Sequence, residues 1–414
     1  MSIRRQSGLR VFIGVLFKMN NIWSDNKLIN LCINILIFLV GINFLHFGQL
    51  ILPVICFLLF VDNRLKFKVN DPKLFIGLCL FGLVFFAFTY KYNAFYSVMG
   101  FTCPMAYYIG SNMKHPSEEN IKKIVYLFAI SMSLHIILNS IYEYIVHGHH
   151  GFFMSTTHYD FWTKEKIANT ATAVNIDILI GCLYYLIFHE KNNAVRISLF
   201  VLFAASLFYL LVIARRTPIF MAAIVMAFSF VYEAYILKNS TKKQRKIFTI
   251  LACCAIAIVA LLVTIYSLNL FNCRATWDGY HIVQKFKQKF INDQRFELYF
   301  GSFGLMPNYL WGGQHISTIL GEQVHDFWID IYDYAGIVPC FVMIVCSVME
   351  LMVIVRCLKS NRISNEFKTL ILGVSICIIM QLFFEPVMTG ASLFLLIAII
   401  ILGFFERIIV SKED

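Results

Sequence analysis

Charge is what this sequence has least of. Only 14% of its 414 residues are Asp, Glu, Lys or Arg, whereas 59% are hydrophobic. A soluble globular domain carries about 25% charged residues, so the composition excludes an ordinary soluble protein. Lys and Arg outnumber Asp and Glu by 35 to 24, but they fall in short groups between apolar runs. That distribution is typical of orientation in a membrane and argues against nucleic-acid binding.

The signatures of several soluble enzymes are also missing. The sequence has no GxxxxGK[ST] loop for a nucleotide, no HExxH for a zinc protease and no GxSxG for a hydrolase. None of the 12 Cys residues forms a CxxC pair, and nearly all lie in apolar runs, where a thiol behaves as a small hydrophobic group. We therefore expect no disulfide framework, no metal and no cofactor. The basic N-terminal segment 1–20 is interpreted as an interfacial amphipathic helix rather than a signal peptide.

Apolar runs long enough to cross a membrane recur along the whole chain. A bilayer core of about 30 Å needs about 20 apolar residues in a helix. This rule predicts about twelve transmembrane helices, at residues 28–45, 47–61, 74–90, 94–111, 124–146, 167–188, 197–213, 217–237, 247–270, 326–355, 369–385 and 391–408. The chain is thus predicted to be an all-α polytopic membrane protein forming a single membrane-embedded domain over residues 1–414.

The basic residues predict which connections lie inside. If the N-terminus is cytoplasmic, the inner connections all carry Lys or Arg, from NRLKFK at 63–68 to KNSTKKQRK at 238–246. Both termini are then cytoplasmic, and the longest connection, 271–325, is an outer loop. Within it, apolar residues recur at helical spacing beside a basic group, which predicts an amphipathic helix on the outer surface: Ile282, Val283, Phe286, Phe290 and Ile291, with Lys285, Lys287 and Lys289.

An arginine pair, Arg215 and Arg216, lies between two central predicted spans. A charge at membrane depth costs on the order of 3 kcal/mol, so such a pair needs an anionic partner or an interfacial position. The planar guanidinium suits a phosphate, which makes the pair a candidate diphosphate clamp. The alternative is that these are topology charges and that the span count is off by one.

The long loop ends in a candidate general base, His325. Histidine titrates near neutrality and can accept the proton of a hydroxyl nucleophile. Asp326 and Asp330 share a helical face, and either is a candidate to orient it. Glu385, before Pro386 at the outer end of the eleventh predicted span, is predicted to face the same cavity. Arg295, earlier in the loop, is a further candidate for binding phosphate. The alternatives are an interfacial histidine with a satisfied hydrogen bond and an exposed arginine paired with a nearby acid.

Four histidines, His147, His149, His150 and His158, gather in an earlier outer loop. Their spacing is not a recognised metal arrangement and no Cys lies nearby. We interpret this segment as an ordinary polar loop.

In layout, the chain resembles the superfamily of O-antigen ligases and Wzy-like O-antigen and capsule polymerases. Its short motifs fit at Arg216-Thr217, Arg295, Gly312-Gly313 and His325. Arg215 and Asp326 depart from the family pattern, which has Ser and Asn at those positions. The resemblance implies a metal-independent membrane glycosyltransferase of the C type.

The donor and acceptor that the resemblance implies are undecaprenyl-diphosphate-linked glycans, used at the outer face of a bacterial cytoplasmic (inner) membrane. Arg215, Arg216 and Arg295 would hold the diphosphate, and His325, with Asp326, would deprotonate the acceptor hydroxyl. The resemblance also allows a chain-length regulator protein as a partner. Polymerase is preferred to ligase because the predicted outer loops are small.

Two other classes fit parts of the pattern. A polysaccharide transporter or flippase commonly has twelve spans, but it should show related halves with broken helices in corresponding positions. An O-acyltransferase uses a membrane histidine, but it does not need outer arginines. Unequal loops and a polar stretch concentrated after the ninth predicted span favour the glycosyltransferase.

Overall fold

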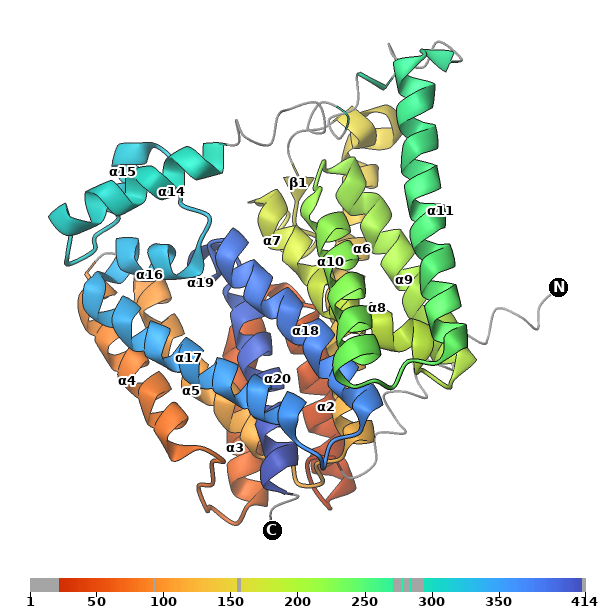
Figure 1. Cartoon of the computed structure of the whole chain (residues 1–414). Coiled ribbons are helices and arrows are strands. Elements are labelled where there is room, and N and C mark those ends of the chain that lie inside the picture. Colours follow the sequence, from red (N-terminus) through yellow and green to blue (C-terminus); the bar gives the residue numbers. More distant parts are fainter. Residues whose placement is uncertain are drawn as a thin grey trace.

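The structure is a computed structural model that describes residues 22–91, 94–154, 158–270, 277–278, 283 and 294–411. This part of the chain is a bundle of helices, with one two-stranded antiparallel hairpin that the sequence did not predict (Figure 1). The elements up to the hairpin are α2 (Lys27–Gly41), η1 (Phe44–His46), α3 (Gly48–Asp62), α4 (Pro72–Thr89), α5 (Ala94–Ser111), α6 (Glu118–Met154), β1 (His158–Tyr159) and β2 (Lys166–Ile167).

The remaining elements complete the bundle and cover one end of it. They are α7 (Asn169–Ala173), η2 (Val174–Ile176), α8 (Asp177–Phe188), α9 (Asn193–Val212), α10 (Thr217–Val231), η3 (Tyr232–Ile236), α11 (Lys242–Ser267), α14 (Gln294–Leu305), η6 (Met306–Asn308), α15 (His315–Leu320), α16 (Phe327–Ala335), α17 (Ile337–Lys359), α18 (Asn365–Phe384), α19 (Val387–Gly390) and α20 (Ser392–Val410).

Nine helices in the described ranges are long and apolar enough to cross a membrane. The prediction of a helical, polytopic membrane protein is confirmed. Each of the twelve predicted spans contains a helix, but α2 and α3 have only 15 residues each, and α5 carries several hydroxyl side chains. The number of spans therefore stays a prediction.

The predicted span 326–355 is wrong as a single helix. The structure divides it into α16 and α17 at Gly336, whose φ is +86°. A side chain there would meet the backbone of the preceding loop, because a Cβ on Gly336 would lie 2.4 Å from the carbonyl oxygen of Leu310. Average hydropathy does not detect a one-residue break, so the sequence rule joined the two helices.

Glycines bring the central helices into close contact. A Cβ on Gly110 of α5 would lie 2.3 Å from the carbonyl oxygen of Ile400 in α20, and a Cβ on Gly181 of α8 would lie 2.6 Å from Cα of Val374 in α18. Small residues allow such backbone approach between membrane helices. Among the late helices long enough to cross a membrane, α18 and α20 are consequently the most enclosed, whereas α11 lies at the side of the bundle with its side chains exposed (Figure 1).

Short elements gather at one end of the bundle. In Figure 1, α14, α15, α16, α19 and β1 lie at the top of the view, and the C-terminus lies at the bottom. This end is the predicted outer end, and it holds the candidate site.

Candidate functional site

The candidate general base has an acidic partner. His325 Nδ1 lies 3.2 Å from Oε2 of Glu385, which follows the last residue of α18. The His325 side chain is 25% exposed and that of Glu385 only 4%. An Nδ1–H that donates to the buried carboxylate leaves Nε2 with the lone pair, so the ring nitrogen remote from Glu385 is the one able to accept a proton.

A tyrosine from the long loop fixes the backbone around this pair. The hydroxyl of Tyr299, in α14, lies 2.5 Å from the carbonyl oxygen of His325 and also contacts the carbonyl oxygen of Phe383. Phe383 in turn packs on Trp328 of α16, with ring centroids 4.8 Å apart. These contacts join α14, α16 and α18 at His325. No sequence motif indicates Tyr299, because its partners lie far from it along the chain.

The aspartates after His325 have other partners. Asp326 is the N-cap of α16, and its Oδ1 accepts the backbone N–H of Ile329 at 2.9 Å. Asp330 accepts the backbone N–H and the hydroxyl of Thr389 at 3.0 and 2.8 Å, which attaches α16 to α19. Within the described residues, the carboxylate that contacts His325 is therefore Glu385, and the predicted orienting role of Asp326 or Asp330 has no contact to support it.

Burial raises the pKa of the carboxyl groups of both Asp326 and Asp330. Burial raises the pKa of Asp326 to about 6, against the opposing effect of its backbone hydrogen bonds. It raises the pKa of Asp330 to about 7, and the hydrogen bonds from Thr389 offset only part of that rise.

The Gly312-Gly313 turn packs against the backbone at the junction of α16 and α17. Gly312 has a φ of +75°, and a Cβ there would lie 2.6 Å from the backbone nitrogen of Gly336. The N–H of Gly313 donates to the carbonyl of Tyr334 at 3.1 Å, and the N–H of Gln314 donates to that of Asp333 at 2.8 Å. The turn therefore braces the break between α16 and α17, and these two N–H groups are already used.

The arginine pair lies at the same end of the bundle as His325. The chain turns at Ala214, whose φ is +58°, and Arg216 is the N-cap of α10. One turn into α10, Met221 Sδ lies 3.4 Å from Nε2 of Gln381, and Gln381 precedes Glu385 by one turn of α18. The side chains of Arg215 and Arg216 are both half-buried.

A polar layer lies beneath Glu385. Gln381 Nε2 also donates to Oδ2 of Asp177 at 2.5 Å, and both side chains are buried. Polar groups therefore continue from the His325 pair into the bundle between α8 and α18.

Part of the predicted site cannot be placed. Arg295 belongs to α14, four residues before Tyr299, but its side chain lies outside the described residues. Most of the predicted surface helix, with Lys285, Lys287 and Lys289, lies outside them as well.

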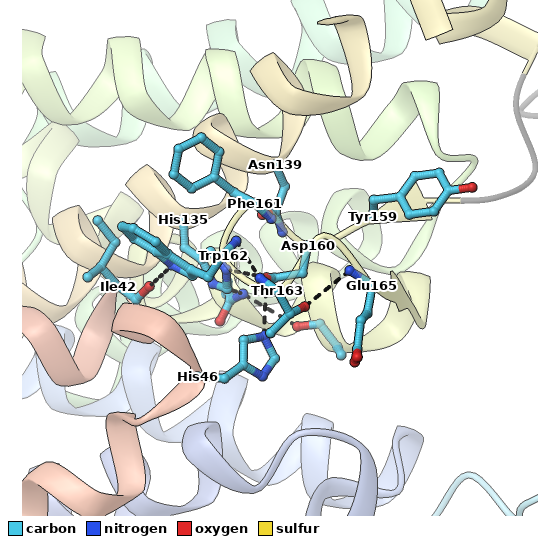
Figure 2. A network of polar contacts seen from close by, with 12 residues as sticks. Ile42, His46, His135, Asn139, Tyr159, Asp160, Phe161, Trp162, Thr163 and Glu165 are labelled. Atoms are coloured by element: carbon cyan, nitrogen blue, oxygen red, sulfur yellow. Dashed lines mark hydrogen bonds and ion pairs between the residues drawn. The ribbon is translucent and has the colours of Figure 1, made fainter. Parts of the chain in front are cut away.

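A second histidine–carboxylate cluster lies at the same end and was missed by sequence reasoning (Figure 2). Oδ2 of the buried Asp160 lies 2.8 Å from Nε2 of His135 and 3.2 Å from Nε2 of His46. Its Oδ1 accepts the backbone N–H groups of Trp162 and Thr163 at 2.7 and 3.0 Å. The cluster ties the loop between α2 and α3, the middle of α6 and the hairpin to one another.

The electrostatics of this cluster favour an ion pair. The hydrogen bond to Asp160 raises the pKa of His46 against the opposing effect of burial. Burial alone would raise the pKa of Asp160, but hydrogen bonds from His135 and His46 outweigh it and hold that pKa well below its usual range. Close to His46 along the chain, Gln49 Nε2 of α3 donates to Oγ of Ser392, at the start of α20, at 2.6 Å.

The histidine-rich segment also has an acidic partner, and its prediction as a loop is wrong for His147, His149 and His150, because α6 continues to Met154. Oε2 of Glu143 lies 3.3 Å from Nε2 of His147 and 3.7 Å from Nδ1 of His158. The described part of the chain contains no group of three or more His, Cys, Asp or Glu arranged to hold a metal ion. Glu143 also accepts the backbone N–H of Tyr159, so this carboxylate attaches β1 to α6, and His158 of β1 lies beside it.

No protein-family model matches the sequence, and it has no significant match among curated proteins. The resemblance in layout to the O-antigen ligase and polymerase superfamily stays a prediction.

Proposed function

We propose that this chain is a membrane glycosyltransferase that polymerises undecaprenyl-diphosphate-linked oligosaccharide repeat units into O-antigen or capsule polysaccharide. The reaction takes place on the outer face of a bacterial cytoplasmic membrane, with both termini of the chain in the cytoplasm. One observation carries the proposal: a partly exposed histidine with a carboxylate on Nδ1 lies at the same bundle end as a half-buried arginine pair.

The chemistry requires two kinds of group, and this end of the bundle supplies both. The acceptor hydroxyl attacks the anomeric carbon of the donor sugar, and the bond from that carbon to the diphosphate oxygen breaks. Undecaprenyl diphosphate leaves with the electron pair, and the hydroxyl proton passes to Nε2 of His325. Glu385 keeps the ring oriented and stabilises the imidazolium that forms, as carboxylates do beside catalytic histidines.

Negative charge develops on the diphosphate as the sugar leaves. Arg215 and Arg216 would stabilise that charge more in the transition state than in the ground state, and this difference accelerates the reaction. Arg295, close to Tyr299 along α14, is proposed to share this role. Removing one such group commonly lowers the rate by about 100-fold or more.

The test is the length of surface polysaccharide chains in cells that lack their own copy of the gene. They are complemented with the wild type, His325→Ala, Arg216→Ala or the control His315→Ala, an exposed histidine of the same loop, and expression is checked by blot. If the chain is a polymerase, we expect a ladder of polysaccharide lengths with the wild type and the control. With the two site variants we expect a single repeat unit. A ladder with every variant would contradict the proposal and favour a transporter. Loss of even the single unit from the lipid core would identify an O-antigen ligase.

A further inference from the structure

A second candidate binding place lies at the opposite end of the bundle from His325. It is a cavity of ≈ 440 Å³ between α3, α4 and α5, with walls that include Phe57, Phe75, Cys79 and Met105. Its volume is within the range of small-molecule sites, about 300–1,000 Å³. Phe75 and Cys79 of the cavity wall lie toward the N-terminal end of α4. The other end of α4 lies beside the long loop, because Phe88 stacks on Trp311 with ring centroids 5.9 Å apart.

The walls of this cavity exclude polar ligands. Its lining residues are five Phe, one Pro, one Met, two Cys and one Tyr, whose hydroxyl is the only oxygen among their side chains. Phe57, on the bundle surface, is 64% exposed, so the cavity adjoins the side of the bundle that faces the hydrocarbon of the bilayer. A sugar or nucleotide would leave its polar groups unpaired here, whereas a hydrocarbon chain would not.

The rim of the cavity is basic. The connection between α3 and α4 contributes Phe67 to the wall, and the Phe67 ring stacks on Tyr108 with centroids 4.8 Å apart. On either side of Phe67 along the chain, Lys66 and Lys68 are exposed, and so is Arg64.

Hydrogen bonds hold this basic connection against α5. Nδ2 of Asn112 donates to the carbonyl oxygen of Lys68 at 2.9 Å, and Nδ2 of Asn63 donates to Oδ1 of Asn112 at 2.9 Å. The two acids nearest along the chain have other partners. Asp62 accepts the hydroxyl of Ser24 at 2.5 Å, and Asp71 is the N-cap of α4, where it accepts the N–H of Lys73 at 2.8 Å. The three cations are therefore kept beside the mouth of the cavity.

We propose that this is a binding site for an anionic phospholipid of the inner leaflet. One acyl chain lies in the cavity between α3, α4 and α5, and the phosphate of the headgroup lies against Arg64, Lys66 and Lys68. The charge complements the headgroup, and the apolar walls complement the chain. The site is independent of the proposed glycosyl transfer, because it lies at the other end of α4.

The headgroup part of the proposal is tested by native mass spectrometry of the full chain in neutral detergent. Phosphatidylglycerol and phosphatidylcholine with identical acyl chains are titrated separately. Each Lys or Arg near an anionic headgroup adds to the binding free energy, and removing two of them should weaken lipid binding about thirtyfold. We expect Lys66→Ala with Lys68→Ala to weaken phosphatidylglycerol by about this factor, and Lys242→Ala with Lys243→Ala, in another basic connection, to leave it unchanged.

The cavity part is tested by filling it. Cys79→Phe should weaken both lipids by about tenfold or more, since the acyl chain loses the apolar surface it buries. Cys32→Phe, at another partly exposed cysteine, in α2, is the control and should bind as the wild type does.

Two results would overturn the proposal. One is equal affinity of the wild type for the two lipids, or an unchanged preference after the double lysine substitution. The other is equal binding by Cys79→Phe and Cys32→Phe when both unfold at the wild-type temperature without added lipid. Because Lys66 and Lys68 are exposed, their double variant tests the proposal even if the Phe variants fold poorly.

Discussion

Nε2 of His46 lies 3.2 Å from Oδ2 of Asp160, so a half-exposed histidine of the loop between α2 and α3 is paired with a buried carboxylate of the outer hairpin. The pair joins segments that are more than 100 residues apart in the sequence. Its contribution to stability depends on pH in a direction that the two pKa shifts determine.

Thermal stability should depend on this pair most strongly in mildly acidic solution. Because the pKa of His46 is raised in the folded protein, its contribution to the free energy of unfolding is complete below pH 6.5, the ordinary pKa of histidine. That contribution is lost as the pH rises through the pKa of His46 in the folded protein. Because the pKa of Asp160 is lowered in the folded protein, its contribution to the free energy of unfolding is complete above pH 3.8, the ordinary pKa of aspartate. That contribution is lost only as the pH falls through the pKa of Asp160 in the folded protein. Both contributions are complete between these two values.

The experiment compares the unfolding temperature of the wild type and His46→Gln in detergent at pH 5.5 and pH 8.5. The difference between the proteins should be larger at pH 5.5. The control is His115→Gln, which removes an exposed pair with Asp25 and should change little at either pH, because exposed ion pairs contribute little. An equal loss for His46→Gln at both pH values would contradict the assignment.

Replacing the partner of the candidate base should impair turnover while the fold persists. Glu385→Gln keeps the size of the side chain but removes the charge that stabilises an imidazolium at His325, 3.2 Å away. We expect polymerisation to fall by on the order of 100-fold, measured as repeat-unit incorporation by purified protein. Glu297→Gln, an exposed carboxylate of α14, should keep full activity, and a normal rate for Glu385→Gln would exclude its role beside His325.

Removing the Tyr299 hydroxyl should loosen the long loop from the bundle. Tyr299→Phe deletes the group that contacts the carbonyls of His325 and Phe383. A net hydrogen bond contributes about 1 kcal/mol, so the unfolding temperature should fall by a few degrees, and polymerisation should fall with it. Tyr309→Phe is the matched control, because the Tyr309 hydroxyl has no hydrogen bond among the described residues. Equal behaviour of the two variants would show that Tyr299 does not position the loop.

The glycine turn should not tolerate even a methyl group. Gly312→Ala places a Cβ 2.6 Å from backbone atoms of Tyr334 and Gly336, at a φ of +75°. Left-handed strain alone costs on the order of 1 kcal/mol, and the clash adds to it, so we expect less folded protein by fluorescence-detected size exclusion. Gly304→Ala in α14 has nothing within 4 Å of its Cβ and should be neutral or slightly stabilising. A normal yield of folded Gly312→Ala would mean that the turn and the helix break do not pack as described.

The sequence by itself determined the class of structure and most of the helices. Low charge and apolar runs of near-membrane length are local properties, and they predicted a helix-rich polytopic membrane protein, which the structure confirms. The same reasoning placed His325 at a helix mouth and Arg215-Arg216 at a helix junction, and the structure finds both at one end of the bundle. The long loop stood out by its length and polarity alone.

Only the tertiary structure decided which groups meet. Glu385 follows His325 by 60 residues, and no local spacing distinguishes it from the nearer Asp326, whose carboxylate instead caps α16. Asp160 meets His46 and His135 because three separate segments pack together, and Gly336 breaks a helix because the loop around Leu310 approaches its backbone. Hydropathy and helical period report on residues within a few turns of one another, whereas these contacts depend on how helices distant in the sequence pack.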